Sequence, residues 1–363
     1  MESGFLVHCF LDKSNFFPDN VERSTKVKTM SVTVKDVAKE AGISRTTVSN
    51  VFGGKTKYSD ETREAVLAAA KKLGYKPNLA ARSLITNKSG LVGLILPSYL
   101  DTNTLTNSPF YNIIMDSVYS VLRDEAYYDL IIFSVPYKEK LIQVSDWIDT
   151  RNVDGILAVG EYDQNFLKDL NSKSIPVVLI DNYSRGNYPN FSFVNSDDET
   201  GGYLGAQYLV GKGYKKIALC GVELTGPLMQ KRYEGYKSAL KEAGLKEFIF
   251  DKSGTPFEVG LQFADSLAAQ GFDAAFCSED MVAVGILHGM QKKGVRVGQD
   301  FGLVGFDNIY TGRQVFPELT TIDQSIFAKG ETATKTLLKI LKKKTSLGSR
   351  LILPVSLVAR ETA

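Results

Sequence analysis

The sequence predicts an α/β protein in which an N-terminal, all-helical head precedes a larger, two-lobed and doubly wound body. Short helical segments dominate residues 31–74, whereas beyond Gly90 short apolar runs alternate with amphipathic helical stretches. Continuous apolar runs separated by helices indicate parallel strands that are covered on both faces. The runs are too many for one small sheet, so we expect two doubly wound lobes that bind ligands at the carboxyl ends of their strands. They occupy residues 91–97, 130–133, 155–159, 177–181, 217–221, 248–250, 274–277 and 301–307.

Charge is distributed unevenly along the 363 residues, although the net charge is only +2. Residues 31–88 contain eleven lysines and arginines against five aspartates and glutamates, and the first 30 residues contain four of each sign. The rest of the chain is therefore mildly acidic. A short basic segment on an acidic body is typical of a head that binds nucleic acid.

Composition disfavours several other classes of protein. The three cysteines, Cys9, Cys220 and Cys277, have neither zinc nor disulfide spacing, so we expect reduced thiols in a cytoplasmic protein. With only His8 and His288, a histidine-based catalytic or metal site is not expected, and nothing in the sequence indicates a cofactor. No apolar run reaches the length of about 18 residues that a membrane span needs. The N-terminus also lacks the features of a secretory signal.

Residues 34–51 have the spacing of a helix-turn-helix. Gly42 stands where the first helix must end with a positive φ, and Ser44 is a natural N-cap for the second. Arg45, Thr46 and Asn50 face outward on the second helix, where they can reach base edges. A helical hairpin inside an enzyme would need a similar core, but the basic excess and the N-terminal position favour DNA binding. The predicted inward face comprises Val34, Val37, Ile43, Val48 and Val51.

A third helix is predicted between Ser59, its N-cap, and Gly74, which ends it. Asp60 and Glu61 fall in its first turn, where negative charge is favourable. Its apolar stripe belongs to the core of the head and comprises Ala65, Val66, Ala69, Ala70 and Leu73.

The head resembles that of the lactose repressor family over residues 32–95 without a gap. The matching stretches read "VTVKDVAKEAGISRTTVSNVF", "SDETREAVLAAAKKLGYKPN" and "AARSL". The resemblance implies that residues 77–84 form a hinge helix and that Leu84 wedges into the minor groove, where an apolar side chain can open a base step. The set of DNA-contacting residues that it implies is Thr33, Arg45, Thr46, Thr47, Ser49, Asn50, Lys57, Tyr58, Asn78, Ala81 and Leu84.

The expected domain organisation follows from these patterns. Residues 1–30 lack periodicity and are expected to form a disordered extension, followed by the DNA-binding head at 31–76 and the hinge helix and linker at 77–89. Residues 90–363 form the body that binds the effector and dimerises. We expect lobe one at about 90–192 plus 323–345, and lobe two at about 193–322 plus 350–360.

The body resembles, more loosely, the two-lobed fold of periplasmic sugar-binding proteins. The matching motifs are "VVLID", "RYEGY", "SEDMVAVG", "LVGFD" and "LTTIDQ". The resemblance implies that Asp181, Arg232, Glu279 and Asp307 contact the effector, which suits a polyol because charged groups hydrogen-bond paired hydroxyls strongly. Strand-end carboxylates can instead cap helices or hold lobes together, and we expect Asp280 to be structural. Phe110 and Tyr111, in a segment that resembles Asn-Pro-Phe-Phe, either line the site or pack in the core.

Three positions depart from the family pattern. Asn50 stands where many members have arginine, which changes the preferred base because arginine favours guanine and asparagine favours adenine. Glu279 stands where asparagine is usual. Thr255 stands where the family often has an aromatic side chain that stacks, and Phe257 is close enough in sequence to take that role.

The sequence therefore predicts a homodimeric transcriptional repressor whose affinity for a double-stranded DNA operator is set by a sugar or sugar derivative. The alternatives are a corepressor-dependent or global carbon regulator of the same fold, and a sugar-binding transport protein, which would need a signal peptide and no basic head. An enzyme is not expected: residues 91–100 lack a Gly-x-Gly-x-x-Gly turn, and no phosphate loop or Gly-x-Ser-x-Gly elbow occurs.

Overall fold

The computed structural model describes residues 32–52, 58–75, 88–98, 108–125, 128–136, 142–184, 186–343 and 348–363. The chain forms two compact units, residues 1–86 and 87–363. The expected extension at 1–30 and the expected hinge helix at 77–84 lie outside the described residues, as do His8 and Cys9.

In the part of the head that the structure describes there are three helices, α1 (Val34–Glu40), α2 (Arg45–Phe52) and α3 (Asp60–Leu73). Thr33 and Asp36 form a capping box at the start of α1. Gly42 adopts a φ of 65° in the turn after α1, and the Ser44 hydroxyl accepts a hydrogen bond from the Thr47 N–H at 3.1 Å. Gly74 ends α3 with a φ of 64°. The predicted helix signals are therefore confirmed.

The core of the head is small and aliphatic. Val37, Val48, Val51 and Val66 are its most buried valines, and Val34 and Ile43 pack against them. The predicted inward face is confirmed. Ala65 is exposed, so the apolar stripe of α3 is narrower than predicted and begins at the following residue.

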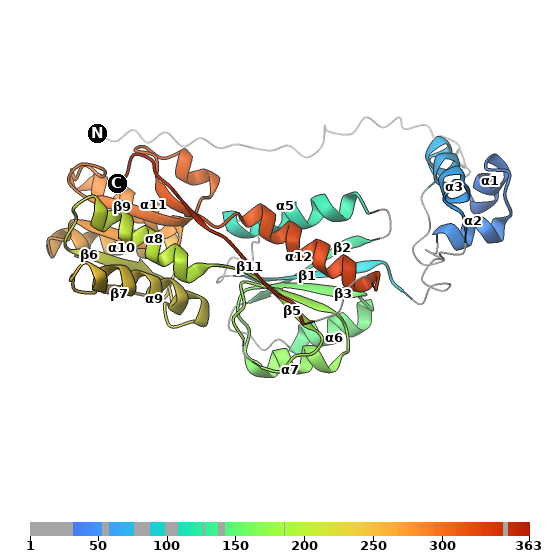
Figure 1. The fold of residues 1–363 in the computed structure, drawn as a ribbon, viewed down its shortest axis with the longest axis horizontal. Coiled ribbons are helices and arrows are strands. Elements are labelled where there is room, and N and C mark those ends of the chain that lie inside the picture. Colours follow the sequence, from blue (N-terminus) through green and yellow to red (C-terminus); the bar gives the residue numbers. More distant parts are fainter. Residues whose placement is uncertain are drawn as a thin grey trace, which may run out of the picture. The chain divides into compact units, whose positions relative to one another are not determined.

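Within the described residues, lobe one of the body is built on a six-stranded parallel sheet. The helices α5 (Pro109–Arg123) and α12 (Ile326–Leu341) pack together on one face of the sheet, and α6 (Ile142–Arg151) and α7 (Gln164–Ser172) lie on the other (Figure 1). Its central strands are wholly buried, as expected for a parallel sheet between helices. In spatial order the strands are β11 (Arg350–Leu353), β5 (Phe191–Ser196), β4 (Val177–Ile180), β3 (Gly155–Val159), β1 (Leu91–Ser98) and β2 (Asp129–Pro136).

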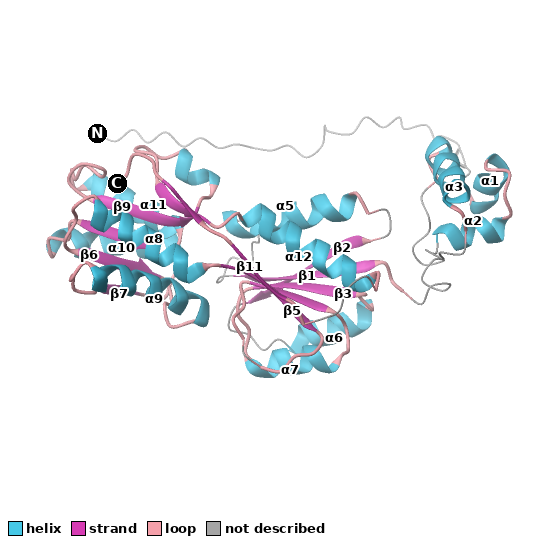
Figure 2. Ribbon diagram, viewed as in Figure 1, coloured by secondary structure: helices cyan, strands magenta, loops and turns pink. Residues whose placement is uncertain are grey.

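Lobe two repeats this architecture with one difference, because its last strand pairs antiparallel to its neighbour. Helices α8 (Asp198–Gly211) and α9 (Pro227–Glu242) share one apolar cluster with the sheet, and α10 (Pro256–Ala269) and α11 (Asp280–Lys292) share another. Figure 2 shows the strands of each lobe enclosed by helices. The described strands, in spatial order, are β12 (Ser356–Val358), β10 (Thr320–Asp323), β9 (Gly302–Asp307), β8 (Ala274–Cys277), β6 (Ile217–Gly221) and β7 (Ile249–Asp251).

Helices α8 and α9 approach each other unusually closely. A side chain at Gly202 would place its Cβ 2.0 Å from the Arg232 carbonyl oxygen, and one at Gly235 would lie 2.0 Å from the Glu199 carbonyl oxygen. These distances are far below any van der Waals contact, so only glycine allows the two backbones to meet here. The helix pair therefore packs as one block.

The structure moves two of the expected lobe boundaries. The segment from Phe193 to Ser196 belongs to β5, which pairs with β4 of lobe one, and β11 pairs in turn with β5. Both segments therefore lie in lobe one instead of lobe two. Two of the crossings between the lobes come immediately after these strands. An apolar run in the sequence does not reveal which of two similar sheets it joins.

Two cysteines belong to the core of lobe two. Cys220 and Cys277 are both buried, and burial raises the pKa of each thiol. None of the helices in the described ranges is long and apolar enough to cross a membrane.

Candidate DNA-binding and effector sites

The start of α2 lies on the surface of the head. The side chains of Arg45 and Thr46 are exposed, while Thr47 and Asn50 are half-buried. The Asn50 amide donates a hydrogen bond of 2.9 Å to the Tyr58 hydroxyl, which links α2 to the segment that leads into α3. These side chains are held by a firm helical core, an arrangement that suits insertion of α2 into a groove.

The remaining residues predicted to contact DNA divide into two groups. Thr33 is exposed beside α1, where its hydroxyl and its backbone N–H bond to Asp36, and Ser49 is half-buried on α2. The other group lies outside the described residues and consists of Lys57, Asn78, Ala81 and Leu84.

In the body, the predicted effector residues gather where strands of both lobes end. Asp181 follows β4 of lobe one, Glu279 follows β8, and Asp307 ends β9. Arg232 reaches the same region from α9. The carboxyl ends of parallel strands are the expected binding edge of such a sheet, so the topology brings these four residues toward one region.

Arg232 is almost entirely buried and densely contacted. Its Nε lies 2.9 Å from a carboxylate oxygen of Asp198 at the start of α8, and its Nη1 donates to the carbonyl oxygen of Ser278. The guanidinium lies 3.7 Å from the centre of the Phe306 ring, and Nη1 lies 4.0 Å from Asp307. A buried guanidinium needs such partners because desolvation of an unpaired charge is costly.

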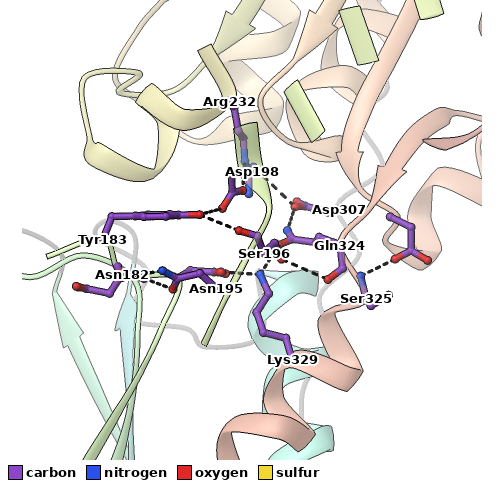
Figure 3. Close-up of polar contacts among 12 residues, drawn as sticks. Asn182, Tyr183, Asn195, Ser196, Asp198, Arg232, Asp307, Gln324, Ser325 and Lys329 are labelled. Atoms are coloured by element: carbon purple, nitrogen blue, oxygen red, sulfur yellow. Dashed lines mark hydrogen bonds and ion pairs between the residues drawn. The ribbon is translucent and has the colours of Figure 1, made fainter. Parts of the chain in front are cut away.

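A buried lysine that is not among the residues predicted from the sequence completes the site. Lys329 on α12 has no exposed surface, and its Nζ lies 2.6 Å from Asp181 Oδ1. It also donates to the side-chain oxygen of Gln324, whose amide nitrogen donates to Asp307. The chain Asp181–Lys329–Gln324–Asp307 therefore runs from lobe one to lobe two. Figure 3 shows its members Lys329, Gln324 and Asp307.

A second polar connection between the lobes is centred on Tyr183. Its hydroxyl donates to the carbonyl oxygen of Ser196 at 2.8 Å and lies 2.7 Å from Asp198. In Figure 3, Tyr183, Ser196, Asp198 and Arg232 form a continuous set of contacts. Because Asp198 also binds Arg232, the tyrosine of lobe one contacts the ion pair of lobe two.

Several carboxyl groups in this region resist ionisation. Burial raises the pKa of Asp307 to about 7 and that of Glu279 to about 8, and the charge of Asp307 adds to the rise for Glu279. Burial also raises the pKa of Asp181, against the opposing effect of Lys329. Clustered groups with raised pKa values are typical of functional sites.

The other residues named from sequence occupy structural positions or the rim of the network. The Asp280 carboxylate accepts hydrogen bonds from Thr321 and from the Ile309 N–H, which is the structural role expected for it. Tyr111 is buried in the core of lobe one, whereas Phe110 is half-buried with its ring 5.7 Å from Lys329 Nζ. Phe257 packs against the core of lobe two.

The missed residues left weak signals in the sequence. Lys329 is a charged residue on the apolar face of its helix, since Ile326, Ala333 and Leu337 are buried around it. A lysine at such a position indicates a buried counter-charge. Gln324 ends the motif "LTTIDQ", but an uncharged side chain in a motif does not by itself indicate a partner.

Comparison with known proteins identifies the chain. Residues 33–78 match the family described as bacterial regulatory proteins, lacI family, and residues 206–363 match the periplasmic binding protein-like domain. The HTH-type transcriptional repressor PurR of Mannheimia succiniciproducens is 33% identical over 337 residues, which cover 91% of this chain and 98% of the relative. The chain belongs to the lacI family of bacterial regulatory proteins.

Solved structures agree with this membership. A Lac repressor dimer bound to operator and the anti-inducer ONPF is 26% identical, with a TM-score of 0.71 and coverage of 91% of this chain and 98% of that one. A complex of the transcriptional regulator CelR with cellobiose is 25% identical, with a TM-score of 0.70 and coverage of 92% and 100%. The protein is thus a DNA-binding transcriptional repressor of this family with an effector-controlled body. Its relatives are repressors and not enzymes, which agrees with the expectation from the sequence.

Proposed function

We propose that the body binds a small sugar or sugar derivative between its lobes and that this effector sets the operator affinity of a homodimer. The observation that supports the proposal is the convergence of Arg232 and Asp307 of lobe two with the Asp181–Lys329 pair of lobe one. A ligand that bonds to both groups would be sensitive to the arrangement of the lobes. The likeness to a regulator solved with cellobiose supports a carbohydrate.

The chemistry of these residues suits a polyol. Carboxylates accept hydrogen bonds from hydroxyl groups, and the guanidinium of Arg232 donates several in a fixed plane. Phe306 already stacks on one side of that guanidinium, which keeps its plane fixed. An effector with adjacent hydroxyl groups would therefore find donors and acceptors already oriented, which lowers the entropic cost of binding.

Control of DNA binding follows from linkage. An effector with higher affinity for one lobe arrangement increases the population of that arrangement. If that arrangement favours operator binding the effector is a corepressor, and if it disfavours operator binding the effector is an inducer. In this proposal Arg45, Thr46 and Asn50 read bases while Thr33, Thr47, Ser49 and Tyr58 support contacts to the backbone. Lys57, Asn78, Ala81 and Leu84 extend the DNA contacts through the segments outside the described residues.

Two measurements test the proposal. Selection from a random pool of duplex DNA should yield a two-fold symmetric sequence, because a dimer presents two copies of α2. Calorimetric titration of the full-length protein with a carbohydrate panel that includes cellobiose should identify a sugar that also changes the affinity for the selected DNA. A protein that binds a sugar but no DNA would be a transport-type binding protein, and one that binds DNA with no response to any sugar would refute the carbohydrate effector.

A further inference from the structure

One contact between the lobes shares no residue with the network of Arg232 and Lys329. Glu161, in the loop after β3 of lobe one, accepts a hydrogen bond of 2.6 Å from the Leu228 N–H in the first turn of α9 of lobe two. We propose that Glu161 is a positioning residue that holds the lobes in the arrangement in which Arg232 faces the residues of lobe one. This inference rests on the proposed effector site.

The start of α9 lacks a cap of its own. Its N-cap is Gly226, which has no side chain, its first residue is Pro227, which has no N–H, and its first turn contains no acidic residue. Leu228 therefore provides the first backbone donor of the helix. A carboxylate at this position satisfies that donor and interacts favourably with the positive end of the helix dipole. Here the carboxylate comes from the other lobe.

The loop that carries Glu161 is firmly held. The Gly160 N–H donates to the Ile180 carbonyl oxygen at 2.8 Å, and the Gly160 carbonyl oxygen accepts from the Asn182 amide at 2.9 Å. The Tyr162 hydroxyl donates to the Val159 carbonyl oxygen at 2.8 Å. The residues on both sides of Glu161 are thus fixed within lobe one. The contact of Glu161 with Leu228 therefore fixes the start of α9 relative to lobe one.

The contact is also close to the proposed effector site. Leu228 lies one helical turn before Arg232 on α9. A Cβ atom at Gly226 would lie only 2.8 Å from the second carboxylate oxygen of Glu161, so the carboxylate packs tightly against the cap residue. The pKa of Glu161 is raised to about 7, mainly by burial and also by the charges of Asp198 and Asp181, against the opposing effect of the Leu228 hydrogen bond. The side chain is therefore partly desolvated at the junction between the lobes.

Asp163 provides a matched control. Its carboxylate accepts hydrogen bonds from the Asn165 and Phe166 N–H groups at 2.8 and 2.9 Å, and so caps α7 within lobe one. Glu161→Ala and Asp163→Ala each remove one helix-capping carboxylate from neighbouring positions. Only the first removal breaks a contact between lobes, so a general effect on stability and a specific effect on lobe arrangement can be separated.

The test measures the distance between the lobes by double electron–electron resonance between two spin labels. Spin labels are placed at Lys168→Cys on α7 and Lys241→Cys on α9 in a Cys9→Ser background, since Cys220 and Cys277 are buried. Mixing with excess unlabelled protein ensures that each distance reports on one protomer. We expect Asp163→Ala to keep the distance distribution of the parent and Glu161→Ala to broaden and lengthen it. A Glu161→Ala distribution that coincides with the parent's would overturn the proposal.

Glu161→Gln tests the cause of the effect. Glutamine keeps an acceptor oxygen at the same place, so we expect it to preserve the parental distribution. A distribution as broad as that of Glu161→Ala would show that the hydrogen bond is not the cause. With any sugar from the panel that binds the parent, Glu161→Ala should weaken binding roughly tenfold. If no sugar binds the parent, the proposed effector is wrong, whereas the label distances still decide the role of Glu161.

Discussion

The two lobes share a fold but hold their buried cations differently. In lobe one, the ammonium of Lys329 is a compact charge that lies between Asp181 and Gln324. In lobe two, the guanidinium of Arg232 bonds to Asp198, stacks on Phe306 and extends toward Asp307. The comparison indicates that Lys329 mainly fixes the shape of the site, whereas Arg232, with five N–H donors in one plane, retains capacity for a ligand.

The largest expected effect concerns Lys329. Lys329→Met should destabilise the body by about 3–5 kcal/mol, because it leaves Asp181 buried without its counter-charge. Urea unfolding followed by circular dichroism measures the change. Lys335→Met is the control, since Lys335 on the same helix forms an exposed pair with Glu331. Equal midpoints for the two variants would show that the buried pair does not stabilise lobe one.

A smaller effect, on binding, is expected at Arg232. Arg232→Lys keeps a positive charge beside Asp198 but loses the planar set of donors, so effector affinity should fall by roughly 2 kcal/mol. Titration with the effector sugar measures it, and affinity for DNA without effector should be unchanged. Arg296→Lys, at an exposed pair with Asp300, serves as the control. If Arg232→Lys keeps the effector affinity of the parent, Arg232 stabilises its lobe just as Lys329 does, and the two buried cations do not differ in role.

The smallest expected effect is a dependence of stability on pH. An unfolded carboxyl has its pKa near 4, whereas Glu279 and Asp307 have values of about 8 and about 7 in the folded protein. The folded state therefore binds protons more tightly, and the associated stability is complete below about pH 4 and declines as the pH rises toward 8. Glu279→Gln should reduce this decline, because it removes one of the two carboxyl groups that release a proton as the pH rises. Melting temperatures at pH 5.5 and pH 8 provide the measurement. The same change in melting temperature between these pH values in parent and variant would contradict the raised pKa of Glu279.

The sequence predicted what local chemistry determines. Gly42, Ser44 and Gly74 mark helix ends through rules that act within a few residues, and the structure confirms them. Apolar runs likewise predicted parallel strands, because burial on both faces requires continuous apolarity. Asp181, Arg232, Glu279 and Asp307 were selected by family resemblance, and their contacts with an effector remain predictions.

Long-range pairing is what the sequence did not reveal. Lys329 and Asp181 are far apart in the chain, so neither residue indicates its partner. Glu161 lies in an ordinary loop, and its contact with α9 depends on how the two lobes are placed. The assignment of β5 and β11 to lobe one has the same origin, because sheet membership is set by pairing across long sequence separations.

The close approach of α8 and α9 determines how a force applied at Arg232 would spread. Because their backbones touch at Gly202 and Gly235, neither helix can slide without displacing the other. Asp198 begins α8 and Arg232 lies on α9, so both ends of this ion pair belong to the same rigid block. A ligand that bonds to the guanidinium would therefore act on α8 and α9 together instead of on one helix alone.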